Sequence, residues 1–149
     1  MTLAYSGLLT QLAQHIGIDA GSLLAQQVLR IGELDVFLQQ GGTPEAPEVL
    51  LCSVLGRPCA QRFAEVLRTL MQANHRGMGT AGGTLGLSPA GDAISWSQRR
   101  AARDLDGAML AAGIAGFAAL GQAWMQYVIA DPGEAAQVSA HVLDAGMRA

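Results

Sequence analysis

The sequence predicts an α+β fold, in which helices pack on an antiparallel β-sheet in the order α-β-β-β-α-β-β-α. Two observations lead to this prediction. Apolar residues recur at three- and four-residue steps in some segments, which is the helical period, and at every second residue in others, which is the period of a strand. The predicted strands are joined by hairpin-length connections, which antiparallel strands allow and parallel strands do not. A chain of 149 residues has room for one hydrophobic core.

The first helix and the first two strands are predicted from a change of period near residue 26. Ser6 is available to cap the helix, and Gly17 to end it. Beyond Gln26 apolar and polar residues alternate, which predicts two strands that turn near Gly32. The apolar positions are Leu8, Leu9, Leu12 and Ile16 in the helix and Leu29, Ile31, Leu34, Val36 and Leu38 in the strands.

The middle of the chain predicts a third strand and a second helix. Residues 41–47 contain two glycines and two prolines and are expected to form a loop. Residues 49–55 are apolar on both faces, which predicts a buried or interface strand that ends at Gly56. The second helix is expected to begin at Pro58, because proline is favoured in the first helical turn. Its apolar face consists of Phe63, Val66, Leu67, Leu70, Met71 and Asn74.

A hairpin and a third helix complete the predicted domain. A glycine-rich stretch, residues 77–83, leads into strands that contain Leu85 and Leu87, then Ile94 and Trp96. The third helix is expected to begin at Asp104 or Asp106 and to end at residues 131–133. Its predicted stripe is Leu105, Met109, Ala112, Gly116, Leu120 and Trp124. Residues 1–130 are therefore expected to form one domain, and residues 131–149 a C-terminal extension that is helical or frayed.

The composition favours a folded protein that keeps apolar surface for a partner. Half of the residues are hydrophobic and only 14% are charged, whereas about a quarter are charged in a typical domain. The simplest use of the surplus apolar surface is dimerisation. The net charge is −3 and the basic residues, all arginine, form no phosphate-binding stripe, so nucleic acid is not expected as a partner. Cys52 and Cys59 have neither metal nor redox spacing, which favours reduced thiols in a cytosolic protein.

The motifs that suggest chemistry have ordinary structural explanations. Gly77, Gly79 and Gly82 match the dinucleotide fingerprint G-x-G-x-x-G, but here a helix precedes the glycines and a strand follows them, the reverse of what phosphate binding requires. A nucleotide-binding or enzymatic domain built on Gly77–Gly82 stays as the alternative. No serine lies in a nucleophile elbow. The three histidines, His15, His75 and His141, are isolated in the sequence, so no metal site, no cofactor site and no catalytic residue is predicted.

A second alternative is a membrane-associated protein. Residues 107–130 carry no formal charge and are long enough to span a bilayer. Gln122, Gln126, four glycines and many alanines make such a span weakly apolar, so no membrane span is predicted. The N-terminal residues 1–16 have no basic residue ahead of their apolar positions, so no secretory signal is expected either.

Residues 34–124 resemble the class I chaperones of bacterial type III secretion, also called the Tir-chaperone-like family. The most specific part is the leucine-rich run at residues 67–74, which ends in Ala73-Asn74. The run leads into a Thr-Gly-Gly-like turn at Thr80, a leucine-rich hairpin and a last helix. The further residues that carry the likeness are Gly77, Gly79, Gly82, Gly83, Leu85, Leu87, Ile94, Trp96, Leu105, Asp106, Phe117 and Trp124. The chain departs from the family at Ala81, which splits the Thr-Gly-Gly turn, and in its continuation past Val128.

The resemblance implies a non-catalytic cytoplasmic homodimer that holds the N-terminal chaperone-binding segment of one or more secreted effectors in an extended state. An extended client adds hydrogen bonds at a sheet edge and inserts alternate apolar side chains. The expected effector-binding residues are Leu8, Leu12, Ile16, Val28, Leu34, Val36 and Leu38. The expected dimer-interface residues are Phe63, Val66, Leu67, Leu70 and Met71. Burial in the core of a single protomer explains either set equally well, and docking on the secretion ATPase is left open.

Overall fold

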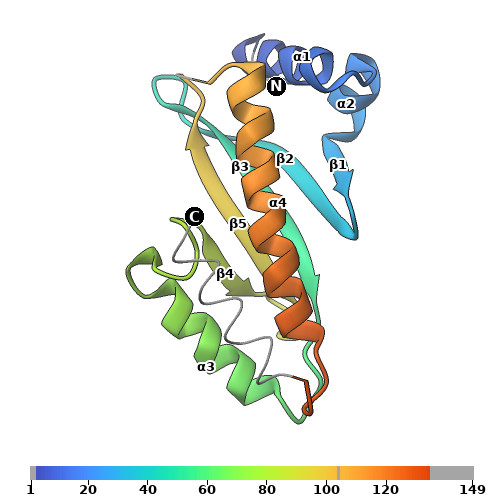
Figure 1. The fold of residues 1–149 in the computed structure, drawn as a ribbon. Coiled ribbons are helices and arrows are strands. Elements are labelled where there is room, and N and C mark those ends of the chain that lie inside the picture. The colour runs from blue at the N-terminus through green and yellow to red at the C-terminus, as the bar shows by residue number, and fades with distance from the viewer. Residues whose placement is uncertain (1–2, 104, 135–149) are drawn as a thin grey trace.

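A computed structural model of the chain describes residues 3–103 and 105–134. It has the expected α+β architecture, with one further short helix and one 3-10 turn (Figure 1). The elements are α1 (Leu3–Ile16), α2 (Ala20–Gln26), β1 (Val28–Ile31), β2 (Leu34–Gly42), β3 (Pro47–Gly56), α3 (Phe63–Asn74), η1 (His75–Gly77), β4 (Thr84–Leu87), β5 (Ile94–Ala101) and α4 (Gly107–Ile129).

The five strands form one sheet in the order β1-β2-β3-β5-β4, and every neighbouring pair is antiparallel. The expected antiparallel sheet is therefore confirmed. The register places Val36 opposite Leu29 and Leu51 opposite Leu38. Because side chains alternate across a strand, this register brings the apolar residues of neighbouring strands to one face.

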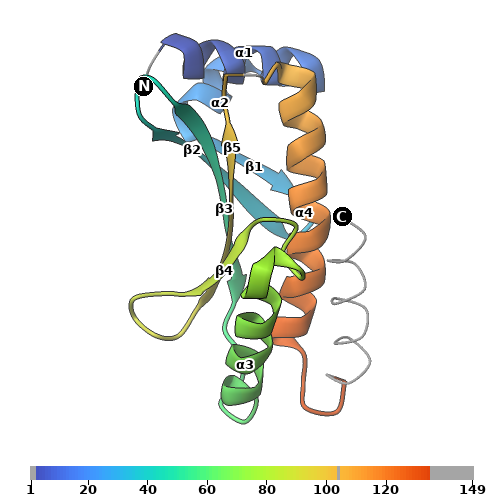
Figure 2. The same ribbon diagram turned by 90° about the vertical axis from the view of Figure 1, so that its left-hand side faces the viewer.

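Helix α4 lies across that apolar face, while no helix of the described residues covers the other face (Figures 1 and 2). Trp96 is fully buried between the two layers, where its indole stacks on Phe117 with ring centroids 5.3 Å apart and donates a hydrogen bond to the Phe117 carbonyl at 3.2 Å. Gly121 permits the close approach of the helix, because a Cβ atom there would lie 2.8 Å from Leu34 Cδ2 and 3.1 Å from Trp96 Cδ1. The core is thus a helix-on-sheet layer built around these two aromatic rings.

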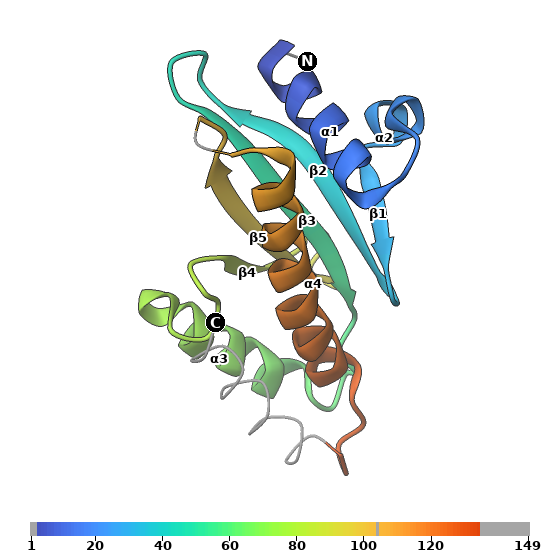
Figure 3. The same ribbon diagram turned by 45° about the horizontal axis from the view of Figure 1, so that its top comes forward.

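Helix α1 crosses the N-terminal end of α4, and α3 lies at the opposite end of the sheet (Figures 1 and 3). Leu9, Leu12 and Ala13 of α1 are fully buried. The side-chain oxygen of Gln11 accepts a hydrogen bond from the Gly107 N–H at 3.2 Å. The contact joins the two helices where α4 begins.

Three predicted boundaries are wrong. Ser6 lies inside α1 and does not cap it, because the helix begins at Leu3. The loop expected at residues 41–47 is shorter, because Gly41 and Gly42 belong to β2 and Pro47 belongs to β3. A positive φ of 75° at Gly42 permits the turn at residues 43–46. Helix α3 begins at Phe63 and not at Pro58, because residues 60–62 form a turn closed by a hydrogen bond from the Arg62 N–H to the Cys59 carbonyl.

The predicted stripe of α4 is wrong in part. Met109, Ala112 and Gly116 are exposed. The helix is apolar almost all round, with small residues on several sides, so the sequence period does not select one face. Asp106 caps the helix as expected, since its carboxylate accepts a hydrogen bond from the Met109 N–H at 2.8 Å. Asp104 and the extension at residues 135–149 lie outside the described residues. The face that packs on the sheet and on α1 includes Leu110, Gly113, Ile114, Phe117, Gly121, Trp124 and Val128.

By length and composition, α4 is the single helix among the described residues that could cross a membrane. Of its most apolar 18-residue window, 44% is buried inside the protein. Core helices of globular domains share this composition, and the buried side of α4 packs on the sheet, whereas Met109 and Ile129 are exposed.

The glycine-rich segment has the order that the sequence indicates, with α3 and η1 before it and β4 after it. Gly79 lies against α3, where its N–H donates to the Ala73 carbonyl at 3.0 Å. Its own carbonyl accepts a hydrogen bond from Trp124 Nε1 at 3.1 Å. The side chain of Asn74 then bonds both backbone groups of Leu85, at 2.8 and 3.0 Å, and so fixes the end of α3 to β4. These contacts give the segment a structural role.

Candidate functional site

An apolar groove lies between the end of α1, the edge strand β1 and the N-terminal half of α4. Figure 3 shows these three elements side by side. Its volume is about 340 Å³. Ile16 and Ile18 stand at its rim with 40% and 42% of their surface exposed, although isoleucine is normally buried. The lining residues are Leu12, Ile16, Ile18, Leu29, Arg30, Ile31, Ala111, Ile114 and Ala115.

The strand beside this groove has one free edge. Among the described residues, β1 pairs with β2 only and is the first strand of the sheet. Gln122 holds its end on α4, because its side-chain amide donates to the Ile31 carbonyl at 2.9 Å. A free strand edge presents unpaired N–H and C=O groups that another extended chain can pair with. The groove therefore combines exposed apolar side chains with a template for main-chain hydrogen bonds.

Helix α2, which the sequence analysis missed, connects α1 to β1 beside the groove. It has seven residues, and the Asp19 carboxylate caps it by accepting a hydrogen bond from the Ser22 N–H at 2.6 Å. This backbone hydrogen bond lowers the pKa of Asp19. The capping residue was the sequence signal that could have located the helix.

The expected effector-binding residues fall into two groups. Leu8, Leu12, Leu34, Val36 and Leu38 are buried in the core of the protomer, with at most 5% of their surface exposed. Ile16 stands at the groove rim, and Val28 is half-buried on the helix-free face, opposite Phe37. Of the set, only Leu12 and Ile16 line the groove. Their role in binding an effector stays a prediction. Ile18, Leu29 and Ile31 are groove residues that the sequence analysis did not select, because Ile18 follows the helix stop and the strand pattern does not show which face stays open.

A second apolar surface lies on the open side of α3, at the other end of the molecule (Figure 1). It is a shallow groove of about 600 Å³. Met71 stands in it with 75% of its surface exposed. The surface is lined by Ala64, Leu67, Arg68, Met71, Gln72 and His75.

The expected dimer-interface residues are divided between the two sides of α3. Val66 and Leu70 face the core and are buried, and Phe63 is half-buried. Leu67 and Met71 lie on the open side. The dimer contact stays a prediction, and the open side makes Leu67 and Met71 the residues of the set that are available for it.

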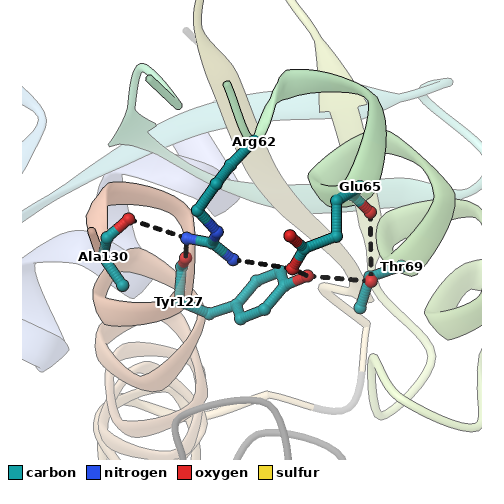
Figure 4. Close-up of polar contacts among 5 residues, drawn as sticks. All are labelled: Arg62, Glu65, Thr69, Tyr127 and Ala130. Carbon is teal, nitrogen blue, oxygen red and sulfur yellow. Dashed lines mark hydrogen bonds and ion pairs between the residues drawn. The ribbon is translucent and has the colours of Figure 1, made fainter. Parts of the chain in front are cut away.

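A buried arginine ties the start of α3 to the end of α4 (Figure 4). The Arg62 side chain is 2% exposed. Its Nη1 donates to the carbonyl oxygens of Tyr127 at 2.9 Å and Ala130 at 2.8 Å, which belong to the last turn of α4 and would otherwise have no intrahelical partner. Its guanidinium lies 4.9 Å from the centroid of the Tyr127 ring. Arg62 therefore acts as a C-terminal cap for α4.

Glu65 and Thr69 complete this network from α3 (Figure 4). Arg62 Nη2 donates to Glu65 Oε1 at 3.1 Å, and this hydrogen bond holds the pKa of the Glu65 carboxyl below its usual value. The Tyr127 hydroxyl lies 2.8 Å from Thr69 Oγ1 and 3.2 Å from Glu65 Oε1. The network fixes the direction in which α3 presents its open side.

Reactive side chains are not brought together in the described part of the chain. Cys59 is exposed and Cys52 is half-buried, and burial raises the pKa of the Cys52 thiol, which favours the unreactive protonated form. No group of three or more His, Cys, Asp or Glu residues within the described ranges could hold a metal ion. His141 lies outside those ranges.

The sequence model of the Tir chaperone protein (CesT) family matches residues 7–125 of the chain. The chain belongs to this family. The Tir chaperone family consists of type III secretion chaperones, and the resemblance drawn from the leucine-rich run and the glycine turn is confirmed at this level. Among curated proteins, no sequence matches the chain.

Three solved structures show the fold of this Tir chaperone family member in other proteins. The first comes from the complex of ExsC with ExsE, with a TM-score of 0.66 and 19% identity over 87% of this chain and 98% of the other. The second, from the HopA1–SchA chaperone–effector complex, has a TM-score of 0.61 and 16% identity over 83% and 94%. The third, from the ExoT–SpcS complex of Pseudomonas aeruginosa, has a TM-score of 0.57 and 17% identity over 80% and 95%.

Proposed function

We propose that this chaperone is a non-catalytic homodimer that holds the N-terminal chaperone-binding segment of one or more effectors extended, soluble and ready for secretion in the bacterial cytoplasm. The apolar groove beside the free edge of β1 is the observation that carries the proposal. One of the similar structures, HopA1–SchA, is described as a chaperone–effector complex, and the other two are complexes of two different proteins. This supports an effector as the partner.

The groove suits an extended client for two physical reasons. Main-chain hydrogen bonds at the β1 edge are independent of the client's sequence, and alternate apolar side chains gain free energy by covering the exposed surface of Ile16 and Ile18. Neither contact needs nucleotide hydrolysis. A client held in this way stays non-globular, because its backbone is already engaged by the chaperone sheet.

Co-purification with an effector tests the groove. We expect Ile18→Asp to lower the yield of the complex strongly, because a carboxylate in the groove must lose its hydration when the client covers it. Val54→Asp is the matched control, since Val54 is 60% exposed on a strand outside the groove. If Ile18→Asp retains the effector as well as Val54→Asp does, the groove is not the binding site.

The open side of α3 is the proposed dimer contact. Exposed Met71 and the apolar stem of Arg68 offer a surface that a second copy of α3 would cover.

The secretion ATPase is a further candidate partner of the dimer. A binding assay between the two purified proteins tests it. A dissociation constant in the micromolar range or tighter would add the ATPase to the proposal.

A further inference from the structure

The sheet has a second free edge, on the half of β5 that β4 does not reach. β4 pairs with residues Ile94 to Ser97 only, whereas β5 continues to Ala101. Figure 1 shows the upper half of β5 at the margin of the sheet, beyond the end of β4. No strand within the described residues covers this side of the last part of β5.

The backbone groups on this edge are identified by the alternation within a strand. The Ala102 N–H donates to the Pro47 carbonyl at 2.8 Å, so it points toward β3. Successive residues of an antiparallel strand point their N–H and C=O groups to opposite sides. Arg99 and Ala101 therefore direct their backbone groups away from β3, to the free edge. The edge offers two residues for main-chain pairing.

A cavity opens beside this edge, between β5 and α4. Its volume is about 130 Å³, and its walls carry both aromatic and polar side chains. Gln98 and Arg100 point into this space, because they share the face of β5 with Trp96, which packs under α4. The residues around the cavity are Ala81, Trp96, Gln98, Arg100, Gly116, Phe117 and Leu120.

Arg100 has no acidic partner among the described residues. Its Nη2 donates to Gln98 Oε1 at 3.0 Å, and its Nε is shielded from solvent without a hydrogen-bond partner. Arg99, on the opposite face of the same strand, forms an ion pair with Glu48 at 3.3 Å. A guanidinium without an acidic partner can form a charge-assisted hydrogen bond with an incoming carboxylate through its terminal nitrogens.

Helix α4 leaves room for this guanidinium at a glycine. A Cβ atom on Gly113 would lie 2.9 Å from Arg100 Cζ and 3.0 Å from Nε. A larger residue at position 113 would force the guanidinium to shift from its present position. The helix and the strand thus hold the positive charge at the place where an added strand would direct its side chains inward.

We propose that the free end of β5 pairs with an extended client segment and that Arg100 binds an acidic side chain of that segment in the cavity under α4. This inference deepens the proposed function, on which it rests, by naming the chemistry of a second contact at the sheet margin opposite β1. Main-chain pairing with Arg99 and Ala101 fixes the register of the client segment. The charge of Arg100 selects a glutamate or aspartate over a neutral residue.

A pair of capped synthetic peptides tests the inference without a known effector. Both alternate threonine and valine, and they differ only in a central glutamate or glutamine. We expect the glutamate peptide to bind the full chain about tenfold more tightly, because the charged acceptor strengthens the hydrogen bonds of Arg100. Binding should also slow hydrogen exchange at the amides of Arg99 and Ala101.

Two variants and a control assign the preference to Arg100. Arg100→Gln removes the charge and should bring the two peptides to equal affinity. Gly113→Ala keeps the charge but shifts it, and should reduce the preference. Arg99→Gln is the control on the opposite face and should keep the tenfold preference. Thermal unfolding checks that each variant is folded. Three outcomes would overturn the inference. The two peptides bind the unaltered chain equally, Arg99→Gln loses the preference, or neither peptide protects the amides of Arg99 and Ala101. The Ile18→Asp comparison depends on another surface, so either proposal can fail alone.

Discussion

At the scale of single residues, Arg62 illustrates how one buried charge joins two helices, the start of α3 and the end of α4. Arginine is rarely buried unless its donors are paired. Arg62 meets this condition at its two terminal nitrogens, through two carbonyls of α4 and the Glu65 carboxylate, whereas its Nε is buried without a partner.

Replacing this arginine should destabilise the fold. Arg62→Met keeps an apolar stem but leaves the Tyr127 and Ala130 carbonyls without their donor, so we expect the free energy of unfolding to fall by about 2–4 kcal/mol. Urea denaturation followed by circular dichroism measures this change. Arg57→Met is the matched control, because Arg57 is 73% exposed in its ion pair with Asp92 and its loss should cost less than about 1 kcal/mol. Equal losses in the two variants would contradict the capping role of Arg62.

The stability of the fold should depend on pH through Glu65. Its pKa in the folded protein lies below the ordinary 4.5, chiefly because of the hydrogen bond from Arg62. A depressed folded-state pKa contributes stability that is present above the unfolded pKa and is lost as the pH falls through the folded value. The difference in unfolding free energy between the unaltered chain and Glu65→Gln should therefore shrink as the pH falls below about 4.5.

The Arg62→Met background provides the control for this pH dependence. Without the guanidinium, the pH dependence of the Glu65→Gln effect should become smaller, because only the weaker lowering of the Glu65 pKa by the Tyr127 hydroxyl remains. A pH dependence as large as that in the unaltered chain would contradict the role of Arg62.

At the scale of elements, two glycines of α4 allow the effect of close packing to be measured apart from the effect of helix propensity. Gly121 faces Leu34 and Trp96 at distances that leave no room for a methyl group, whereas a Cβ atom on Gly116 would meet nothing within 4 Å. Both residues lie in the same helix, so the two substitutions to alanine share the gain in helix propensity of up to about 1 kcal/mol.

We expect opposite effects from these two substitutions. Gly121→Ala should lower the free energy of unfolding by about 1–2 kcal/mol, because overpacking outweighs the propensity gain. Gly116→Ala should raise it by about 0.5–1 kcal/mol. Thermal unfolding of the two variants side by side checks both signs, and a stabilising Gly121→Ala would mean that α4 packs less closely on the sheet.

The elements also show how far the sequence determines the fold. Most strands were predictable from alternation and from turn residues such as Gly32. The strand at residues 49–55 was predicted from an apolar run on both faces, but only one face is buried and Val54 is exposed. The face of α4 was not, since alanine and glycine on several sides make every stripe look equally apolar. Helix α2 is only seven residues long, too short for a period to be recognised. In the candidate site, periodicity identified which residues are apolar, but tertiary packing decided that Leu34 is buried and that Ile16 and Met71 are exposed.

At the scale of the whole molecule, the two apolar surfaces lie at opposite ends of α4 (Figure 1). The groove at α1 and the open side of α3 share no residue. Mutations on one surface should therefore leave the other intact, since distant sites contribute independently to free energy. A variant that loses its dimer contact should still present an unaltered client groove in each protomer.

The substitution Met71→Glu is the test of the dimer at this scale. Met71 is 75% exposed, so the protomer should stay folded, but a second copy that covers α3 would have to desolvate the new carboxylate. We expect the dissociation constant of the dimer to rise by at least about tenfold, which corresponds to about 1.4 kcal/mol. Size-exclusion chromatography with light scattering over a range of concentrations measures it. Met78→Glu is the control, because Met78 is 58% exposed outside α3 and should leave the mass unchanged. If the unaltered chain is monomeric at micromolar concentration, the proposed dimer is wrong. If Met71→Glu dimerises as well as the control, the dimer contact lies elsewhere.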